Sequence, residues 1–170
     1  MAESAFPQDH LQINDIYLWS TSLERENEYQ EGIHRDRTTI QSRQDIQAEI
    51  LEAEGDNHAR ADLLRVMVTL GIRVVFAGEE GKEPSPLHTI EATFAVEYII
   101  LNEFTEKQLK NFCDFNCIHN VWPFWRQHVY DTLKKASLPV VAVPFYPGKP
   151  SGRKKARKKI GPKSAQAPQG

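Results

Sequence analysis

The most regular pattern in the chain is a helical stripe that begins at Ile118 and ends at Leu133. Apolar residues recur there every three or four positions, while the opposite side of the helix carries polar residues. The stripe consists of Ile118, Val121, Trp122, Trp125, Val129 and Leu133. Pro123 lies near its start, so the regular helix either begins there, with proline in the first turn, or kinks there, and Pro139 ends it.

Four segments upstream of this helix alternate between apolar and polar residues, as β-strands do. They cover residues 11–24, 46–50, 64–76 and 89–100. In the first segment, Ile16 and Leu18 place apolar groups on the otherwise polar side, which indicates a bulge or a strand that is covered on both faces. Because the returns between the later segments are short, the pattern predicts an antiparallel sheet with one apolar face.

The connections between these strands are polar. Residues 25–43 show almost no periodicity and have Tyr29 and Ile33 as apolar anchors, so we expect a long connection that is either a binding element or disordered. Residues 78–86, with the sequence GEEGKEPSP, predict the return between the third and fourth strands.

After the strands, Thr105 and Gln108 have the spacing of a capping box, which predicts a short helix before the long one. Strands followed by helices indicate the α+β class, here a four-stranded antiparallel sheet followed by two helices packed on one face. With 170 residues, 40% of them hydrophobic, one domain is expected. We expect a flexible N-terminus over residues 1–10, a domain over 11–148 and a disordered basic tail over 149–170.

Charge is divided unevenly along the chain. The formal net charge is −2, but the segment from Lys149 onward carries eight basic residues and no acid, so the first 148 residues hold thirteen basic residues against twenty-three acidic ones. This basic cluster predicts a tail that binds an acidic partner, either protein or lipid. Its central residues are Lys154, Lys155, Arg157, Lys158 and Lys159. Nucleic acid is a less favoured partner, because no aromatic residue interrupts the basic run and the rest of the chain is acidic.

Catalytic and metal-binding signatures are missing from the sequence. No segment matches a P-loop, a dinucleotide-binding glycine fingerprint, a nucleophile elbow or a zinc hydrolase motif, so we expect no enzyme, no cofactor and no metal site. Cys113 and Cys117, four residues apart, are expected to be small buried residues; His119 would add a third soft ligand, but the spacing does not match zinc modules. Without an apolar signal region or an 18-residue apolar run, a soluble cytoplasmic protein is expected.

Large aromatic residues are the most informative candidates for binding. Trp122 and Trp125 lie on the buried stripe, which favours a role in packing, whereas Phe124 and the rings just after residue 144 lie off it and suit an accessible groove. The candidate set for peptide binding is Trp19, Tyr29, Phe124, Trp125, Phe145 and Tyr146.

Three segments resemble the SecB family of export chaperones. Leu11–Glu24, LQINDIYLWSTSLE, is similar to the family's first strand, and WPFWR at Trp122–Arg126 and LPVVAVP at Leu138–Pro144 are similar to its helix and proline-rich signatures. The likeness covers about residues 10–146 and includes the polar crossover and the order of strands and helices. It implies a homotetramer, built as a dimer of dimers, that holds unfolded preproteins in the cytosol and passes them to the SecA motor of the translocase.

The resemblance also implies where SecA would dock, on acidic side chains of the sheet surface. At the matching end of the first strand this chain keeps Glu24 but has Ser20 in place of an acid, and Glu79 and Glu80 in the predicted hairpin would add negative charge. The implied docking set is therefore Glu24, Glu79 and Glu80. Some SecB-like chaperones instead protect the antitoxin of a toxin–antitoxin system, and altered docking charge would suit that alternative.

Overall fold

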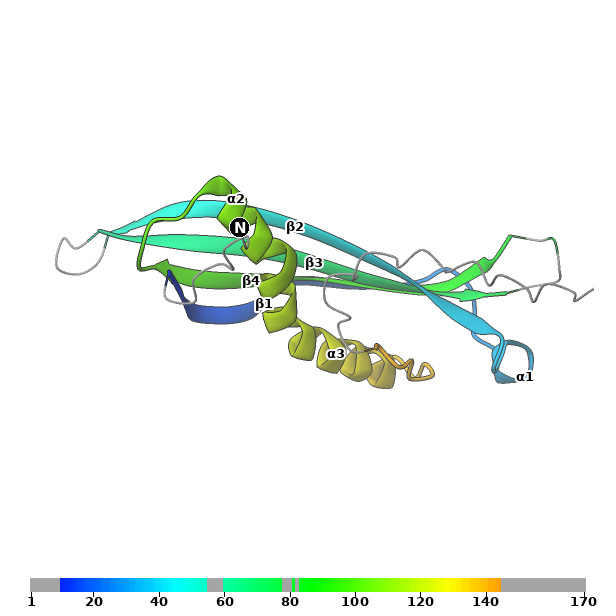
Figure 1. Cartoon of the computed structure of the whole chain (residues 1–170). Coiled ribbons are helices and arrows are strands. Elements are labelled where there is room, and N and C mark those ends of the chain that lie inside the picture. Colours follow the sequence, from blue (N-terminus) through cyan, green and yellow to red (C-terminus); the bar gives the residue numbers. More distant parts are fainter. Residues whose placement is uncertain (1–9, 55–59, 78–80, 82, 145–170) are drawn as a thin grey trace, which may run out of the picture.

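The computed structural model describes residues 10–54, 60–77, 81 and 83–144 of the chain. Its elements are, in order, β1 (Leu11–Arg25), α1 (Glu31–His34), β2 (Thr38–Glu54), β3 (Arg60–Phe76), β4 (Ser85–Ile100), α2 (Glu106–Phe112), a π-helical turn (Cys113–Cys117) and α3 (Ile118–Lys135) (Figure 1). The predicted tail, the domain boundary at residue 148 and four candidate site residues, Phe145, Tyr146, Glu79 and Glu80, lie outside the described residues.

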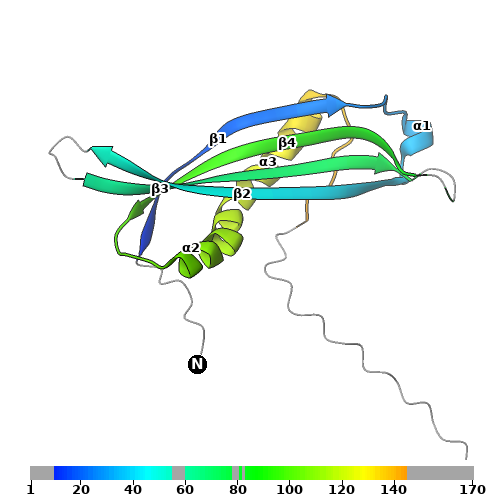
Figure 2. The ribbon, with the colours of Figure 1, turned by 90° about the horizontal axis from the view of Figure 1, so that it is seen from above.

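The four strands form one antiparallel sheet in the order β1–β4–β3–β2 (Figure 2). The two strands with the strongest alternation, β3 and β4, are therefore central, and β1 and β2 are the edges. The connection between β1 and β2 crosses the end of the sheet and carries α1. This confirms the predicted α+β class.

The helices α2 and α3 and the π-helical turn between them lie on one side of the sheet, as predicted (Figures 1 and 2). The core forms where α3 packs on the apolar sides of β3 and β4. Its fully enclosed residues include Leu64, Val66 and Val68 of β3, Ile90, Val96 and Tyr98 of β4, and Val121, Trp125, Val129 and Leu133 of α3. The helix stripe predicted from the sequence is thus the buried face of α3. The opposite face of the sheet, which we call the open face, is not covered by α2 or α3 and carries Arg65, Thr69 and Arg73 of β3.

The second strand is much longer than its pattern predicts. Residues 38–43, expected as part of a connection, pair with β3 from Thr38 opposite Phe76 onward. β2 is an edge strand, and most of its described side chains are exposed on both faces. Polar residues are therefore tolerated on either face, and the sequence does not show the alternation of a half-buried strand. The prediction of a connection as far as Arg43 is therefore wrong, and the crossover is limited to residues 26–37.

The first strand has the irregularity that its sequence predicts. Its pairing with β4 shifts register between Ile13 and Asp15 and again between Leu18 and Ser20. These bulges turn Ile16 toward the helix side, where it packs on the core, and leave Leu18 exposed on that side. The predicted bulges are therefore present, and cover of the second face by another subunit stays a prediction.

The long helix begins five residues before Pro123, directly after the π-helical turn, so the alternative that it starts at the proline is wrong. It ends at Lys135 in a Schellman arrangement. Ser137 adopts a left-handed φ of 54°, and the Leu138 N–H donates to the carbonyl of Leu133 at 2.9 Å. This ending fixes the position of Leu138 and directs the chain into an extended segment. Among the described residues, no helix has the length and apolar character needed to cross a bilayer.

Candidate peptide-binding surface

The extended chain after α3 lies against the rest of the molecule from Leu138 to Pro144, and we call it the 138–144 segment. Leu138 and Val143 are buried, whereas Val140 between them is 43% exposed. The Trp122 indole Nε1–H donates to the Pro144 carbonyl oxygen at 2.9 Å, which fixes the far end of the segment to α3. The sequence signature LPVVAVP is therefore a surface element held at both ends.

Three hollows border the 138–144 segment. The crossover hollow, of about 860 Å³, lies between the segment and the crossover and is lined by Tyr29, Glu31, Arg35, Asp36, Thr38 and residues 137–141. The helix hollow, of about 440 Å³, is lined by Pro123, Arg126, Gln127 and Tyr130 of α3 and by residues 140–143. The sheet hollow, of about 190 Å³, is lined by Ile40, Ser42, Arg43, Gln44, Leu70, Gly71, Ile72, Trp122, Trp125, Val143 and Pro144.

These hollows adjoin because they share wall residues. Val140 and Val141 line both the crossover hollow and the helix hollow, and Val143 lines both the helix hollow and the sheet hollow. Together they follow the 138–144 segment along its length. Valine side chains supply apolar contact along the segment, whereas the exposed wall of the crossover hollow is mostly polar and includes Glu31 and Arg35. Such a surface suits apolar side chains of an extended peptide.

The crossover is an ordered wall of this surface rather than a disordered loop. The N–H groups of Glu26 and Asn27 donate to the Leu87 carbonyl at 2.9 and 3.1 Å, which ties the crossover to the start of β4. Farther along, the ring of His34 packs against Tyr29 at a centroid distance of 5.6 Å and against Phe76 at 4.8 Å. Of the two alternatives that the sequence left open, the structure supports a positioned element.

The structure separates the predicted aromatic residues. Tyr29 lines the crossover hollow, and Trp125, only 1% exposed, belongs to the core and reaches only the inner wall of the sheet hollow. Phe124 is 47% exposed but lines none of the three hollows. It lies one helical turn from His128, whose ring contacts the Thr21 hydroxyl of β1 at 2.8 Å, so Phe124 is on the β1 side of α3.

Trp19 lies on the opposite face of the sheet from the helices and is 57% exposed. The guanidinium of Arg65 lies over its ring at 5.8 Å from the centroid, and the ring of Tyr17 lies at 6.3 Å. Because the sheet separates Trp19 from the 138–144 segment, the two surfaces do not form one groove.

Sequence reasoning missed the role of Trp122, which it assigned to packing. The ring is only partly buried, lines the sheet hollow and holds Pro144. The available signal was its place at the margin of the stripe, in line with Arg126 and Tyr130 at four-residue steps along the side of α3 that faces the 138–144 segment.

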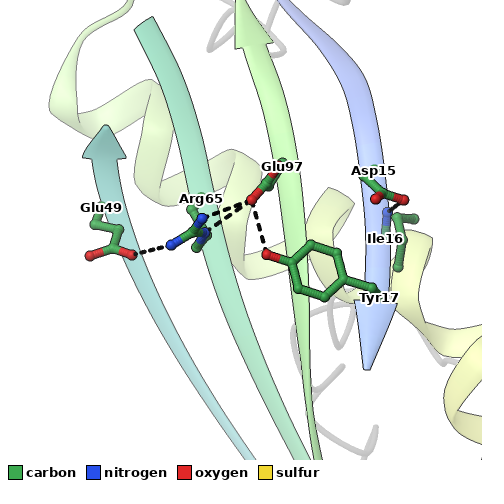
Figure 3. Close-up of polar contacts among 6 residues, drawn as sticks. All are labelled: Asp15, Ile16, Tyr17, Glu49, Arg65 and Glu97. Atoms are coloured by element: carbon green, nitrogen blue, oxygen red, sulfur yellow. Dashed lines mark hydrogen bonds and ion pairs between the residues drawn. The ribbon is translucent and has the colours of Figure 1, made fainter. Parts of the chain in front are cut away.

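The open face of the sheet carries a row of polar contacts across all four strands (Figure 3). Arg65 donates through Nε and Nη2 to Glu97 at 3.1 and 2.9 Å, and Tyr17 donates its hydroxyl proton to the same carboxylate at 3.0 Å. Glu49 lies 3.5 Å from the Arg65 guanidinium. The hydrogen bonds from Arg65 lower the pKa of Glu97, and the hydrogen bond to Glu97 raises the pKa of Tyr17.

Other carboxylates of this face are paired as well. Glu91 lies 3.1 Å from Arg43, and Glu26 lies 3.5 Å from Arg73. Of the predicted docking residues, only Glu24 is among the described residues, and it is exposed near the end of β1. The open face therefore has mixed charge rather than a continuous acidic surface.

The two cysteines are packing residues, as predicted. Both lie buried in the π-helical turn, where the Tyr98 hydroxyl donates to Cys117 Sγ at 3.5 Å and Asn120 donates to the Tyr98 oxygen at 3.1 Å. Burial raises the pKa of both Tyr98 and Cys117 far above the physiological range, so both groups stay protonated. Within the described part of the chain, no three His, Cys, Asp or Glu side chains are placed to hold a metal ion.

Comparison with known proteins identifies the fold. No protein-family model and no curated protein sequence matches this chain. Among solved structures, the Rv1957 SecB-like chaperone of Mycobacterium tuberculosis, in complex with a ChAD peptide from the Rv1956 HigA1 antitoxin, matches with a TM-score of 0.59 and 16% identity over 81% of this chain and 91% of that chain. A Streptococcus agalactiae protein of unknown function matches with a TM-score of 0.36 and 12% identity over 79% of this chain and 97% of that one. The fold is therefore SecB-like.

Proposed function

We propose that this chain is a SecB-like chaperone that holds unfolded polypeptide, and that the three hollows along the 138–144 segment form its peptide-binding surface. The observation that carries the proposal is this row of valine-lined hollows, bounded by an ordered crossover, on a fold whose mycobacterial example was solved with a bound antitoxin peptide. Unfolded clients present apolar side chains in an extended chain, and a surface of valines and rings accepts such segments with little sequence preference.

Assembly as a homotetramer would strengthen weak binding, because several surfaces on one particle act together on one client. The edge strand β1 favours self-association. It is 15 residues long and exposes large apolar side chains on both faces, Ile13 and Leu18 on the helix side and Trp19 on the open side. A second copy paired along this edge would cover side chains that are otherwise left in water.

Two client classes fit a cytosolic chaperone of this kind. The first is preproteins destined for export, which requires transfer to SecA; the second is an antitoxin. The open face favours the antitoxin, because Arg65, Arg73 and Arg43 pair with Glu97, Glu26 and Glu91 and give this face mixed charge rather than a continuous acidic surface. A pull-down with the SecA C-terminal tail distinguishes the two: retention supports export, and no retention together with binding of an antitoxin peptide supports the second class.

The test of chaperone activity is aggregation of a chemically unfolded model protein, followed by light scattering without ATP. The unchanged protein should suppress aggregation at a stoichiometric ratio, and a protein without effect would contradict the proposal. Ile40→Asp, which places a charge on the β2 wall of the sheet hollow, should weaken client binding by about tenfold or more, since an unpaired charge there must be desolvated on binding.

The matched control is Leu101→Asp. Leu101 is an exposed aliphatic residue like Ile40, 52% against 38%, but lines none of the three hollows. It should bind client as the unchanged protein does. Equal losses in the two variants would show that added charge, rather than this surface, decides binding.

A further inference from the structure

The 138–144 segment is itself an extended apolar peptide lying on the surface proposed for clients. Its sequence, LPVVAVP, contains no charged residue, and it forms neither helix nor strand. Leu138 and Val143 fill buried sites, while Val140 points outward. The 138–144 segment is thus an example of what this surface is proposed to hold, an extended, apolar, proline-containing stretch of polypeptide.

Side chains rather than backbone hold the segment in place. Within the described residues, backbone hydrogen bonding stops at Leu138, whose N–H completes the helix ending. Beyond it the fixed points are the buried side chain of Val143, the half-buried side chain of Val141, which packs on the core, and the hydrogen bond from Trp122 to the Pro144 carbonyl. A strand in a sheet must break a ladder of backbone hydrogen bonds to leave, whereas no such ladder holds the described residues of this segment.

The segment also divides the surface. The shared wall residues Val140, Val141 and Val143 stand between adjoining hollows, so moving them away would join the crossover, helix and sheet hollows. The joined surface would expose the ring of Trp122 and the apolar side of Ile40 on β2. It would follow the full length of the segment, which none of the separate hollows does.

We propose that residues 139–144 are a displaceable strap, which occupies the binding surface in the free chain and moves aside when the extended apolar segment of a client takes its place. The pivot is at Ser137 and Leu138, which the Schellman ending of α3 holds in position. This proposal rests on the proposed chaperone function and adds how the binding surface opens.

Fixing the strap chemically tests this. Tyr130 of α3 and Val140 of the strap are both exposed and both line the helix hollow, so the double variant Tyr130→Cys, Val140→Cys places two reactive thiols on opposite walls. The native Cys113 and Cys117 are buried and do not compete for reagent. A short bismaleimide joins the walls, and the same variant with each thiol capped by a monomaleimide is the control. The cross-linked chain should bind an unfolded client about tenfold or more weaker than the capped chain, because the open form is no longer populated. Equal affinity of the two forms overturns the strap.

Hydrogen exchange on the free, full-length protein gives a second test that needs no client. The amides of residues 140–143 should exchange at least about a hundredfold faster than those of residues 129–133 in α3, since among the described residues no backbone hydrogen bond protects them. Equal protection of the two stretches overturns the strap. If the unchanged protein binds no client, the proposed function has failed; if the unchanged protein binds and cross-linking does not weaken binding, only the strap has failed.

Discussion

At the scale of single residues, His88 is the polar side chain most completely hidden in the core. It is 2% exposed, and within the described chain neither ring nitrogen has a hydrogen-bond partner. Burial first, and then the charge of the neighbouring Arg25, lowers the pKa of His88, so the ring is neutral in the folded protein. His88 thus occupies a site where an apolar ring of similar size would lose nothing.

Replacing His88 should therefore change both stability and its pH dependence. The unfolded chain titrates His88 near pH 6.5 and the folded chain titrates it lower, so the unfolded state binds more protons in between and stability falls as the pH drops below about 6.5. His88→Phe removes two unpaired polar atoms and should raise the free energy of unfolding by on the order of 1 kcal/mol at pH 8. The difference in the free energy of unfolding between His88→Phe and the unchanged protein should be larger at pH 5.5 than at pH 8.

Urea unfolding at the two pH values measures this effect. His128, whose pKa burial also lowers, stays in place and leaves part of the pH dependence in the variant. A difference in the free energy of unfolding that is the same at both pH values would mean that His88 is not the titrating group.

At the scale of elements, α3 has two functions on different sides. Trp125 fills the core and Phe124, the adjacent residue, is exposed on the β1 side. Trp125→Ala should lower the free energy of unfolding by about 3–5 kcal/mol, as truncation of a large buried ring does. Phe124→Ala should change it by no more than about 0.5 kcal/mol. Thermal or urea unfolding compares the two variants, and a large loss in Phe124→Ala would mean that a second subunit buries that ring.

The elements that the sequence predicts well are those with one buried face. β3 and β4 alternate clearly because both are central and α3 covers one side of each. The first half of β2 shows no pattern, because an edge strand beyond the helix buries little on either face. The π-helical turn has no sequence signal either, since Cys113 and Cys117, four residues apart, fall on one side of an α-helix as well.

At the scale of the whole molecule, the candidate site depends on strand order. Tyr29 and Val140 are far apart in sequence and line one hollow because the crossover spans the end of the sheet to reach the β2 edge, over which the 138–144 segment lies. Alternation along the sequence predicts four antiparallel strands but not their order. It therefore does not predict that the crossover and the 138–144 segment line the same hollow. The same limit explains why the sequence does not separate Trp19 from the other candidate rings. The face of the sheet that Trp19 occupies depends on the bulge between Leu18 and Ser20.

Assembly is tested at this scale. Leu18→Lys places a charge on the exposed edge strand and should convert the proposed tetramer into a species of lower mass, because the charge would have to be buried on pairing. Leu101→Lys, at a comparably exposed aliphatic residue outside the sheet, should leave the mass unchanged. Light scattering coupled to size exclusion gives both masses. A monomeric unchanged protein would contradict the proposed tetramer, and an unaffected Leu18→Lys would exclude β1 as the edge that associates.

The wide turn at Cys113–Cys117 has a consequence for how chains with this fold vary in length. A π-helical turn holds about one residue more than an α-helical turn, and regular α-helix resumes at Ile118. A related chain lacking one residue here would form a continuous α-helix and still present the equivalent of Trp125 to the sheet. Evolution can therefore gain or lose a single position at this point without rotating the tryptophan-bearing side of α3 away from the strands.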